Sequence, residues 1–249
     1  MSERPYLVFR LYGPMAGWGD IAVGEVRPTN DHPSRSALLG LVAAALGVAR
    51  EEDDYHRRLA GSYHLAIAMQ QRGQPLADYH TVQRPPQRAK VEYTSRRDEL
   101  TRLDKDELAT TVSHRDYCVD TCVTAVIWAA VEDTPVTLEA MAQALRQPHF
   151  TLYLGRKSCP LALPVQAQVV VANDMVSALT TASFKDEALF DRLRLEVGWR
   201  SIAESWIYSD QPFPGAHLIS TRRDEPLSRA RWQFLERQEY CRPPQGMTE

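Results

Sequence analysis

The sequence lacks the features that would place it in several common classes of protein. It has no run of about 18 consecutive apolar residues, which a membrane-spanning helix needs. Its first residues, MSERPYLVFRLYG, have neither the apolar core nor the cleavage site of a secretory signal. Positive and negative residues nearly balance, at a net charge of -3. This balance excludes a uniformly basic nucleic-acid coat but permits a local basic groove.

Cysteine and catalytic motifs are scarce too. Four cysteines in 249 residues do not make a disulfide framework, and no C-x-x-C pair is present. On a strand, Cys118 and Cys122 would lie about 13 Å apart, too far to share one zinc ion. A Walker A loop, a dinucleotide fingerprint and a Ser-His-Asp order are also missing. We therefore expect no metal, no cofactor and a reducing, cytoplasmic location.

What the sequence does contain is an alternation of strand and helix patterns. Strands are expected at 6–12, 63–70, 117–131 and 164–172, and helices at 34–47 and 137–147. Ser34 suits the N-cap of the first helix and Gly47 its C-terminal end, whereas Gly40 inside it predicts close packing on a neighbour. The order is strand, helix, strand, a long polar insertion, then strand, helix, strand. Ferredoxin-like and RNA-recognition domains have this order.

Arg35 and Ser36 stand at the start of the helix expected at 34–47. A helix N-terminus offers free N–H groups and a partial positive charge, so it binds anions. Arg35 there opposes the helix dipole unless an anion lies beside it. Ser36, and Arg27 from the preceding loop, could add donors to one phosphate. A solvated first turn capped by Ser34 explains the same residues, so both interpretations stay open.

The polar insertion runs from about 83 to 107 and shows no apolar period. Its basic residues include Arg84, Arg88 and Lys90, and Tyr93 lies among them. Basic residues with an aromatic between them suit a phosphate backbone with a base to stack on. A solvated loop has the same composition, so the pattern leaves the choice open.

Further polar groups that suit nucleic acid lie on both sides of the insertion. Tyr79 and His80, in DYHTV, could cut RNA by acid–base catalysis, contact a bound nucleotide, or simply end a strand. The loop YLGRKSCPL places Arg156, Lys157 and Ser158 beside a glycine that lets the backbone approach a phosphate.

Several of these segments occur together in one order: LYGPMAGWG, RPT, PSRSALLGLVAAALG, DYHTV, YLGRKSCPL and RRDEP. Together they resemble, over nearly the whole chain, the Cas-five family, to which the CasD subunits of type I-E CRISPR Cascade belong. The segment HRDYCVDTCVTAVIW also looks like the central strand of that family. The insertion and the C-terminal segment match less well.

The resemblance implies a fold of class α+β. A modified ferredoxin-like, RRM-type domain would cover 1–172, with a long polar thumb inserted at about 83–114. A C-terminal β-rich extension, 173–249, would pack on it, with a weak helix at about 186–193.

The resemblance also implies a function. The chain would bind the 5′ handle of the CRISPR RNA and cap one end of the Cascade backbone, with its thumb over the adjoining guide. It would contact the CasC backbone subunits and the large CasA subunit, and meet target DNA only through the complex. In type I-E systems a separate subunit, CasE, cuts the precursor RNA, so no nuclease activity is implied.

The RNA-binding candidates follow from the motifs above. The arginines and serines would hold phosphates, while Trp18, Tyr79 and His80 would stack on bases or contact their edges, although Trp18 also suits a core. The full set is Trp18, Arg27, Arg35, Ser36, Tyr79, His80, Arg84, Arg88, Lys90, His114, Arg115, Arg156, Lys157 and Ser158.

Two other functions stay open at this point. A metal-independent endoribonuclease, as in type I-C relatives that process their own precursor RNA, would use Tyr79, His80, His114 and Lys157 as acid–base groups. A scaffold would use its arginines for protein contacts only. The sequence also leaves open whether RARWQF, at 229–234, faces RNA or the large subunit.

Overall fold

The computed structural model describes residues 3–20, 22, 24–86 and 92–244. Its strands are β1 (Arg4–Ala16), β2 (Trp18–Gly19), β3 (Val26–Arg27), β4 (Thr29–Asn30), β5 (Tyr63–Gln71), β6 (Gln74–Arg84), β7 (Ala109–Ala129), β8 (Gln168–Ala172), β9 (Trp206–Ser209), β10 (Leu218–Ser228) and β11 (Gln233–Arg242). Its helices are α1 (Arg35–Leu46), α2 (Asp53–Ser62), α3 (Arg96–Thr101), α4 (Leu138–Arg146), α5 (Met175–Thr181) and α6 (Glu187–Val197), with a 3-10 turn at Lys105–Glu107. The protein mixes helices with strands, and sheet dominates.

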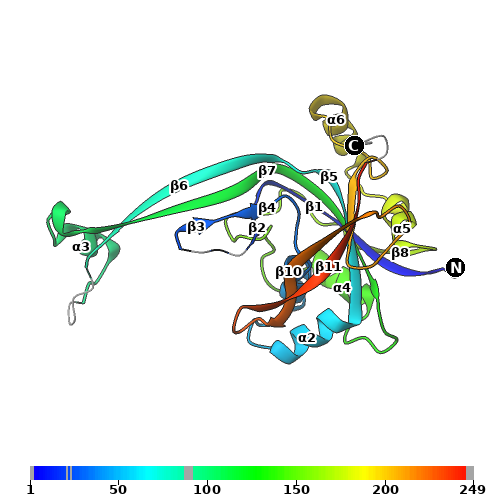
Figure 1. Cartoon of the computed structure of the whole chain (residues 1–249), viewed down its shortest axis with the longest axis horizontal. Helices are drawn as coiled ribbons and strands as arrows, with labels where there is room; N and C mark the ends of the chain where they lie inside the picture. Colours follow the sequence, from blue (N-terminus) through cyan, green and yellow to red (C-terminus); the bar gives the residue numbers. More distant parts are fainter. Residues whose placement is uncertain (1–2, 21, 23, 87–91, 245–249) are drawn as a thin grey trace.

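A twisted sheet organises the body of the protein (Figure 1). Its strands follow the order β10-β11-β9-β5-β7-β1-β8, and each neighbouring pair is antiparallel. β7 lies between β1 and β5, with Ala125 opposite Phe9 on one side and opposite Ile67 on the other. The segment 173–249 supplies β9, β10 and β11 to this sheet, together with α5 and α6. It therefore shares one sheet with the first 172 residues.

Alternating side chains build a core on each face of the sheet. Leu7 and Phe9 of β1 pack with residues of α1, α2 and α4 on one face. Tyr6 and Val8 pack with Met175 and other residues around α5 on the opposite face. Successive strand residues point to opposite faces. Because both faces are covered, consecutive residues of β1 are buried, which explains the unbroken apolar run YLVF.

The helix expected at 34–47 is α1, with the predicted caps. Ser34 accepts a hydrogen bond from the N–H of Ala37, and Gly47 ends the helix with a φ of 80°. The close packing predicted at Gly40 is also present. A Cβ at this position would lie 2.9 Å from Nη2 of Arg229, so a larger residue would displace that guanidinium from its place against the helix.

The strand and helix patterns at 6–12, 63–70, 117–131 and 137–147 are confirmed by β1, β5, β7 and α4. The sequence pattern missed α2, because its sequence DDYHRRLAGS is mostly polar and buries few side chains. It also missed α5, which is only 7 residues long. Among the described residues, no helix is both long and apolar enough to cross a membrane.

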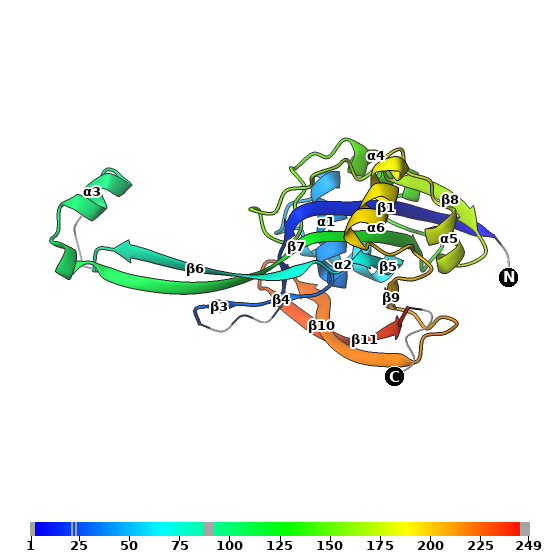
Figure 2. The same cartoon turned by 90° about the horizontal axis from the view of Figure 1, so that it is seen from above.

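A long arm projects from the body (Figures 1 and 2). It consists of β6, paired with β7 from Gln74 opposite Val119 to Arg84 opposite Ala109, and it carries α3 at its tip. The insertion expected at about 83–114 therefore covers only the outer part of this arm. The sequence pattern does not predict the start of the arm. β6 is exposed along almost its whole length, so no apolar alternation marks it as a strand.

Candidate nucleic-acid interface

Arg35 lies inside the protein rather than on a nucleic-acid surface. Only 5% of it is exposed. Its Nε donates to Oδ2 of Asp210 at 2.9 Å and its Nη1 to Oε2 of Glu225 at 2.6 Å. Its Nη2 donates to the carbonyl oxygens of Ala60 and Tyr63, at 2.6 and 2.8 Å. The guanidinium is thus hydrogen-bonded to the strands and the helix around it.

The anion beside the N-terminus of α1 is a side chain of the protein itself. The backbone N–H of Arg35 donates to Oδ2 of Asp224 at 2.7 Å. Ser36 is buried, with its Oγ 3.0 Å from that of Ser34. A carboxylate in this place satisfies the helix dipole as a phosphate would. The expectation that Arg35 and Ser36 hold RNA phosphates is therefore contradicted, and both leave the candidate interface.

Trp18 must also be removed from the candidates. It lies in β2, is 2% exposed and belongs to the main hydrophobic core. A ring buried to this extent has no face on which an RNA base can stack. The alternative interpretation of Trp18 as a core residue is the one the structure supports.

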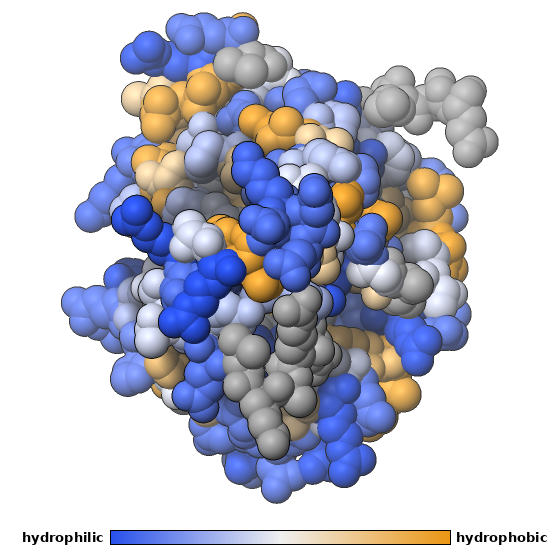
Figure 3. All heavy atoms as spheres, turned by 90° about the vertical axis from the view of Figure 1, so that its left-hand side faces the viewer, coloured by the Kyte–Doolittle hydropathy of each residue, from blue (hydrophilic) through white to orange (hydrophobic). Residues whose placement is uncertain are grey.

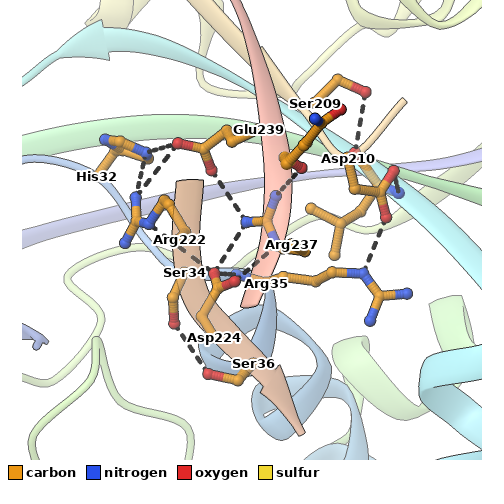
Figure 4. A network of polar contacts seen from close by, with 12 residues as sticks. His32, Ser34, Arg35, Ser36, Ser209, Asp210, Arg222, Asp224, Arg237 and Glu239 are labelled. Atoms are coloured by element: carbon orange, nitrogen blue, oxygen red, sulfur yellow. Dashed lines mark hydrogen bonds and ion pairs between the residues drawn. The ribbon is translucent and has the colours of Figure 1, made fainter. Parts of the chain in front are cut away.

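A buried network of ion pairs ties the β10–β11 hairpin to this end of α1 (Figure 4). Arg237 donates to both carboxylate oxygens of Asp224, at 2.6 and 2.8 Å, and to Oε1 of Glu239 at 3.0 Å. Oε2 of Glu239 lies 2.9 Å from Nε2 of His32 and 3.5 Å from Nη1 of Arg222. The segment RRDEP, which supplies Arg222 and Asp224, therefore holds the hairpin on the body.

This network keeps Glu239 ionised. Burial acts to raise the pKa of Glu239, but the hydrogen bond from His32 and the charges of His32, Arg222 and Arg237 outweigh it and lower the pKa to about 2. Burial likewise acts to lower the pKa of Arg237, yet Asp224 and Glu239 raise it above its usual value. The charges in the network compensate one another, so it is a structural feature rather than a binding site.

A different group of arginines lies at the root of the arm, where β3 runs beside β7. Arg27 and Arg115 occupy adjacent positions on these parallel strands, so their side chains share a face. Both are exposed. The Arg27 guanidinium donates to the carbonyls of Gly24 and Val26, and no hydrogen bond or ion pair joins the Arg115 side chain to another described residue. Like charges side by side repel each other, and a bound phosphate would relieve that repulsion.

Arg156 fastens the root of the arm from the loop at 153–160. Its Nη1 donates to the carbonyl of Asp116 at 2.7 Å and its Nη2 to that of Arg27 at 2.8 Å. Its guanidinium lies 4.7 Å from the centre of the Tyr117 ring. Within the described residues Arg156 has no carboxylate partner, so it adds a full positive charge while it holds β3 against β7. We call Arg27, Arg115 and Arg156 the arm-root arginines.

The residues of DYHTV divide between the two faces of the arm. Tyr79 lies opposite His114, and the two rings meet edge to face with centres 4.9 Å apart. His80 points to the other face, as the next residue on a strand does, and its Nδ1 lies 2.7 Å from Oδ2 of Asp78. Tyr79 and His80 therefore lie on opposite faces of the arm.

The face with His80 is the one that carries the arginines. Asp78 lies opposite Arg115 and so shares its face, and Arg84, farther along the same strand, is on that face and exposed. Lys157 and Ser158 are exposed beside Arg156. Arg88 and Lys90 lie outside the described residues. Seen end-on from the tip of the arm, the surface is mostly hydrophilic, with smaller hydrophobic areas between (Figure 3).

Sequence reasoning missed the carboxylates that accept hydrogen bonds from the backbone and side chain of Arg35. Asp210, Asp224 and Glu225 are 175, 189 and 190 residues away along the chain. The available signal was the pair of acids inside RRDEP, in a stretch expected to form strands. Acids at such positions need cationic partners when the strand is buried.

Comparison with known proteins agrees with this architecture. Residues 6–240 match the family described as CRISPR-associated protein (Cas_Cas5). The chain is 31% identical over 245 residues to the CRISPR system Cascade subunit CasD of Escherichia coli (strain K12), covering 95% of each chain.

Two solved structures have a similar fold. One, titled CRISPR RNA-guided surveillance complex, superposes with a TM-score of 0.61 at 23% identity, covering 96% of this chain and 90% of that one. Another, titled Crystal structure of Cas protein, gives 0.55 at 22% identity, covering 96% and 95%. The family match and the identity to CasD, which both span nearly the full length, establish that the chain belongs to the Cas5 family of CRISPR-associated proteins.

Proposed function

We propose that this chain is a non-catalytic subunit of a Cascade-type surveillance complex and binds the 5′ handle of the CRISPR RNA. Its similarity to a Cascade subunit supports the assignment to such a complex. The observation that carries the RNA contact is the group of arm-root arginines. Arg27, Arg115 and Arg156 meet on three separate elements, and none has a carboxylate partner among the described residues. Phosphates are the partners that such a group lacks.

The core of the body is then a ferredoxin-like, RRM-type fold. Its four strands lie in the order β8-β1-β7-β5, and α1 and α4 belong to the strand–helix–strand units that precede and follow the arm. Such a core supports the assignment to RNA-recognition proteins. The arm corresponds to the family's thumb and reaches over the guide beyond the handle.

The remaining partners follow from the same assignment. The chain caps one end of the Cascade backbone, contacts the CasC subunits and the large CasA subunit, and meets target DNA only through the assembled complex. It acts in the cytoplasm, where the guide RNA is made.

The geometry of the arm favours binding over cleavage. An acid–base nuclease needs its proton-transfer groups around one scissile phosphate. Tyr79 and His114 lie on one face of the arm, whereas His80 is on the other and bonds to Asp78. Lys157 belongs to a separate loop at the root. These groups do not form one constellation, so we assign no catalytic residue.

The test uses the purified chain and a labelled RNA that contains the CRISPR repeat, with and without EDTA, across a salt series. We expect intact RNA on a denaturing gel and filter binding that depends on the 5′ handle and weakens as salt rises. A discrete, EDTA-resistant cut would make the chain a nuclease. Equal binding of RNA with and without the handle would contradict handle recognition and support a role as a scaffold.

A further inference from the structure

Two further arginines, which form no ion pair with the described residues, lie around a pocket of about 550 Å³. The pocket lies between α1, the segment that leads to the 153–160 loop, and the turn between β10 and β11. Small and apolar side chains of α1, among them Leu41 and Ala44, form part of its lining. Cavities of roughly 300–1,000 Å³ are typical of small-molecule and nucleotide sites.

The two arginines of the pocket are Arg229 and Arg50. Nε of Arg229 is buried without a hydrogen-bond partner, and its Nη2 donates to the carbonyl of Ser36. Asp53 accepts from the backbone N–H groups of Arg229 and Ala230, at 2.7 and 3.2 Å, rather than from the guanidinium. Within the described residues no carboxylate forms an ion pair with Arg229 or with Arg50. The pocket is therefore electropositive and incompletely satisfied, unlike the network of Figure 4.

Aromatic rings stand beside these arginines. Trp232 is 57% exposed, and the guanidinium of Arg50 lies 4.7 Å from its ring centre. Tyr153 and Phe150 also line the pocket and are partly exposed. Trp232 has a φ of 52°, a conformation that bulky residues rarely adopt. Strain of this kind persists where the surrounding structure enforces it, and it is frequent at ligand sites.

One loop connects the pocket with the RNA contact proposed above. Tyr153 and Gly155 line it, and the same loop continues directly into Arg156, whose side chain reaches the root of the arm. Gly155 has a φ of 81°, and a Cβ there would lie 2.0 Å from the carbonyl oxygen of Gly17. The loop is thus fixed between the arm-root arginines and the pocket.

We propose that this pocket takes one unstacked nucleotide of the bound RNA. The base packs against Trp232 and Tyr153, and the phosphate lies between Arg50 and Arg229. Bases of single-stranded RNA stack on aromatic rings and on guanidinium planes, so aromatic rings beside unpaired arginines are the chemistry that such a nucleotide needs. The proposal rests on the proposed function, because it assumes that RNA binds at the neighbouring arm root.

The test replaces the exposed members of the pocket in the full chain. Trp232→Ala and Arg50→Ala are the informative variants, because both side chains are exposed and their loss leaves the core intact. The control is Arg231→Ala, which removes an exposed arginine from the same turn but not from the pocket lining. The probe is the repeat-containing RNA with 4-thiouridine at one position at a time, with crosslinks mapped by mass spectrometry and affinity measured by filter binding.

We expect one or two adjacent RNA positions to crosslink to Trp232 or Tyr153. Trp232→Ala should weaken RNA binding about tenfold without changing the salt dependence, since a stacked base carries no charge. Arg50→Ala should weaken binding and lower the salt slope by about 0.7, the value for one phosphate of a single strand. Trp232→Phe should restore most of the affinity, and Arg231→Ala should match the wild type.

Each contrary outcome has a separate meaning. If wild-type chain does not bind the RNA, the proposed function fails as well. If RNA binds through the handle but no crosslink forms and the pocket variants bind normally, only the nucleotide pocket is refuted. If the pocket variants bind RNA normally but no longer assemble with the other subunits, the occupant is a protein segment and the proposal is wrong.

Discussion

Two groups of arginines in this protein look alike in the sequence and differ in their surroundings. Arg35, Arg222 and Arg237 lie within the body, where carboxylates of the protein itself neutralise them. The arm-root arginines bond to backbone carbonyls, or to nothing among the described residues. The difference shows that arginine content alone does not mark a nucleic-acid surface. Whether the protein itself supplies the counter-charge is what distinguishes the two groups.

The largest effect is expected from Arg35→Ala. The substitution leaves Asp210, whose side chain is 5% exposed, without its main cationic partner. Removing one member of a buried ion pair typically costs about 3–5 kcal/mol, a large part of the stability of a domain. Urea unfolding followed by circular dichroism measures the loss. Arg27→Ala is the matched control and should change the free energy of unfolding by less than about 0.5 kcal/mol. Similar losses in both variants would abolish the distinction between the groups.

Lowering the pH should reduce the free energy of unfolding by a somewhat smaller amount. The pKa of Glu239 is about 2 in the folded protein against an ordinary value of 4.5. A carboxyl group with a lowered pKa contributes stability that is complete above the ordinary value and is lost as pH falls through the folded value. The shift corresponds to about 3 kcal/mol, lost between roughly pH 5 and pH 2.

Glu239→Gln tests this contribution. Burial raises the pKa of Glu225 despite Arg35, so protonation of Glu225 favours the folded state and acts in the opposite direction. The difference between the wild type and Glu239→Gln cancels that effect. The variant should be less stable at pH 7, and the gap should narrow as pH falls towards 2. A gap independent of pH would show that Glu239 is not held ionised by its neighbours.

Arg156→Ala should have an intermediate effect, because Arg156 has a structural role as well as an uncompensated charge. It bonds to backbone carbonyls of β3 and β7 and keeps its charge uncompensated. Losing these bonds should cost about 2 kcal/mol and speed hydrogen exchange in β3. Arg156→Lys keeps the charge but cannot bridge both carbonyls, so it should preserve the salt dependence of RNA binding while β3 still exchanges faster. Unchanged exchange in both variants would mean that Arg156 does not fasten the arm.

The local elements of the fold were predictable, and the sites only in part. The sequence correctly predicted both ends of α1, from Ser34 and Gly47, and the close packing at Gly40. Such features depend on the residue itself and its near neighbours. The neutralisation of Arg35 was not predictable, since its partners follow 175 or more residues later. The extent of the arm was missed because β6 buries almost nothing, so its strand pairing leaves no apolar pattern.

The same limit applies to the arm root. Arg27 and Arg115 were both named as candidates from the sequence, but their adjacency depends on the short parallel pairing of β3 with β7. Strands of 2 residues carry no periodic signal. Here the sequence predicts which residues carry charge, whereas only the pairing of strands brings the charges together.

Arg27→Ala and Arg115→Ala should have the smallest effect on the stability of the fold and the most specific effect on RNA binding. Each should leave the free energy of unfolding within about 0.5 kcal/mol of the wild type. Each should weaken binding of handle-containing RNA about tenfold and lower its salt slope by about 0.7, because a phosphate contact releases counterions from a single strand. Arg192→Ala on α6 is the control for a change in net charge, because this arginine is exposed and, among the described residues, pairs only with Glu196. If RNA affinity followed net charge alone, Arg192→Ala would match the other two variants. A loss confined to Arg27 and Arg115 requires that the phosphate lies beside these two arginines, which form no ion pair with the described residues.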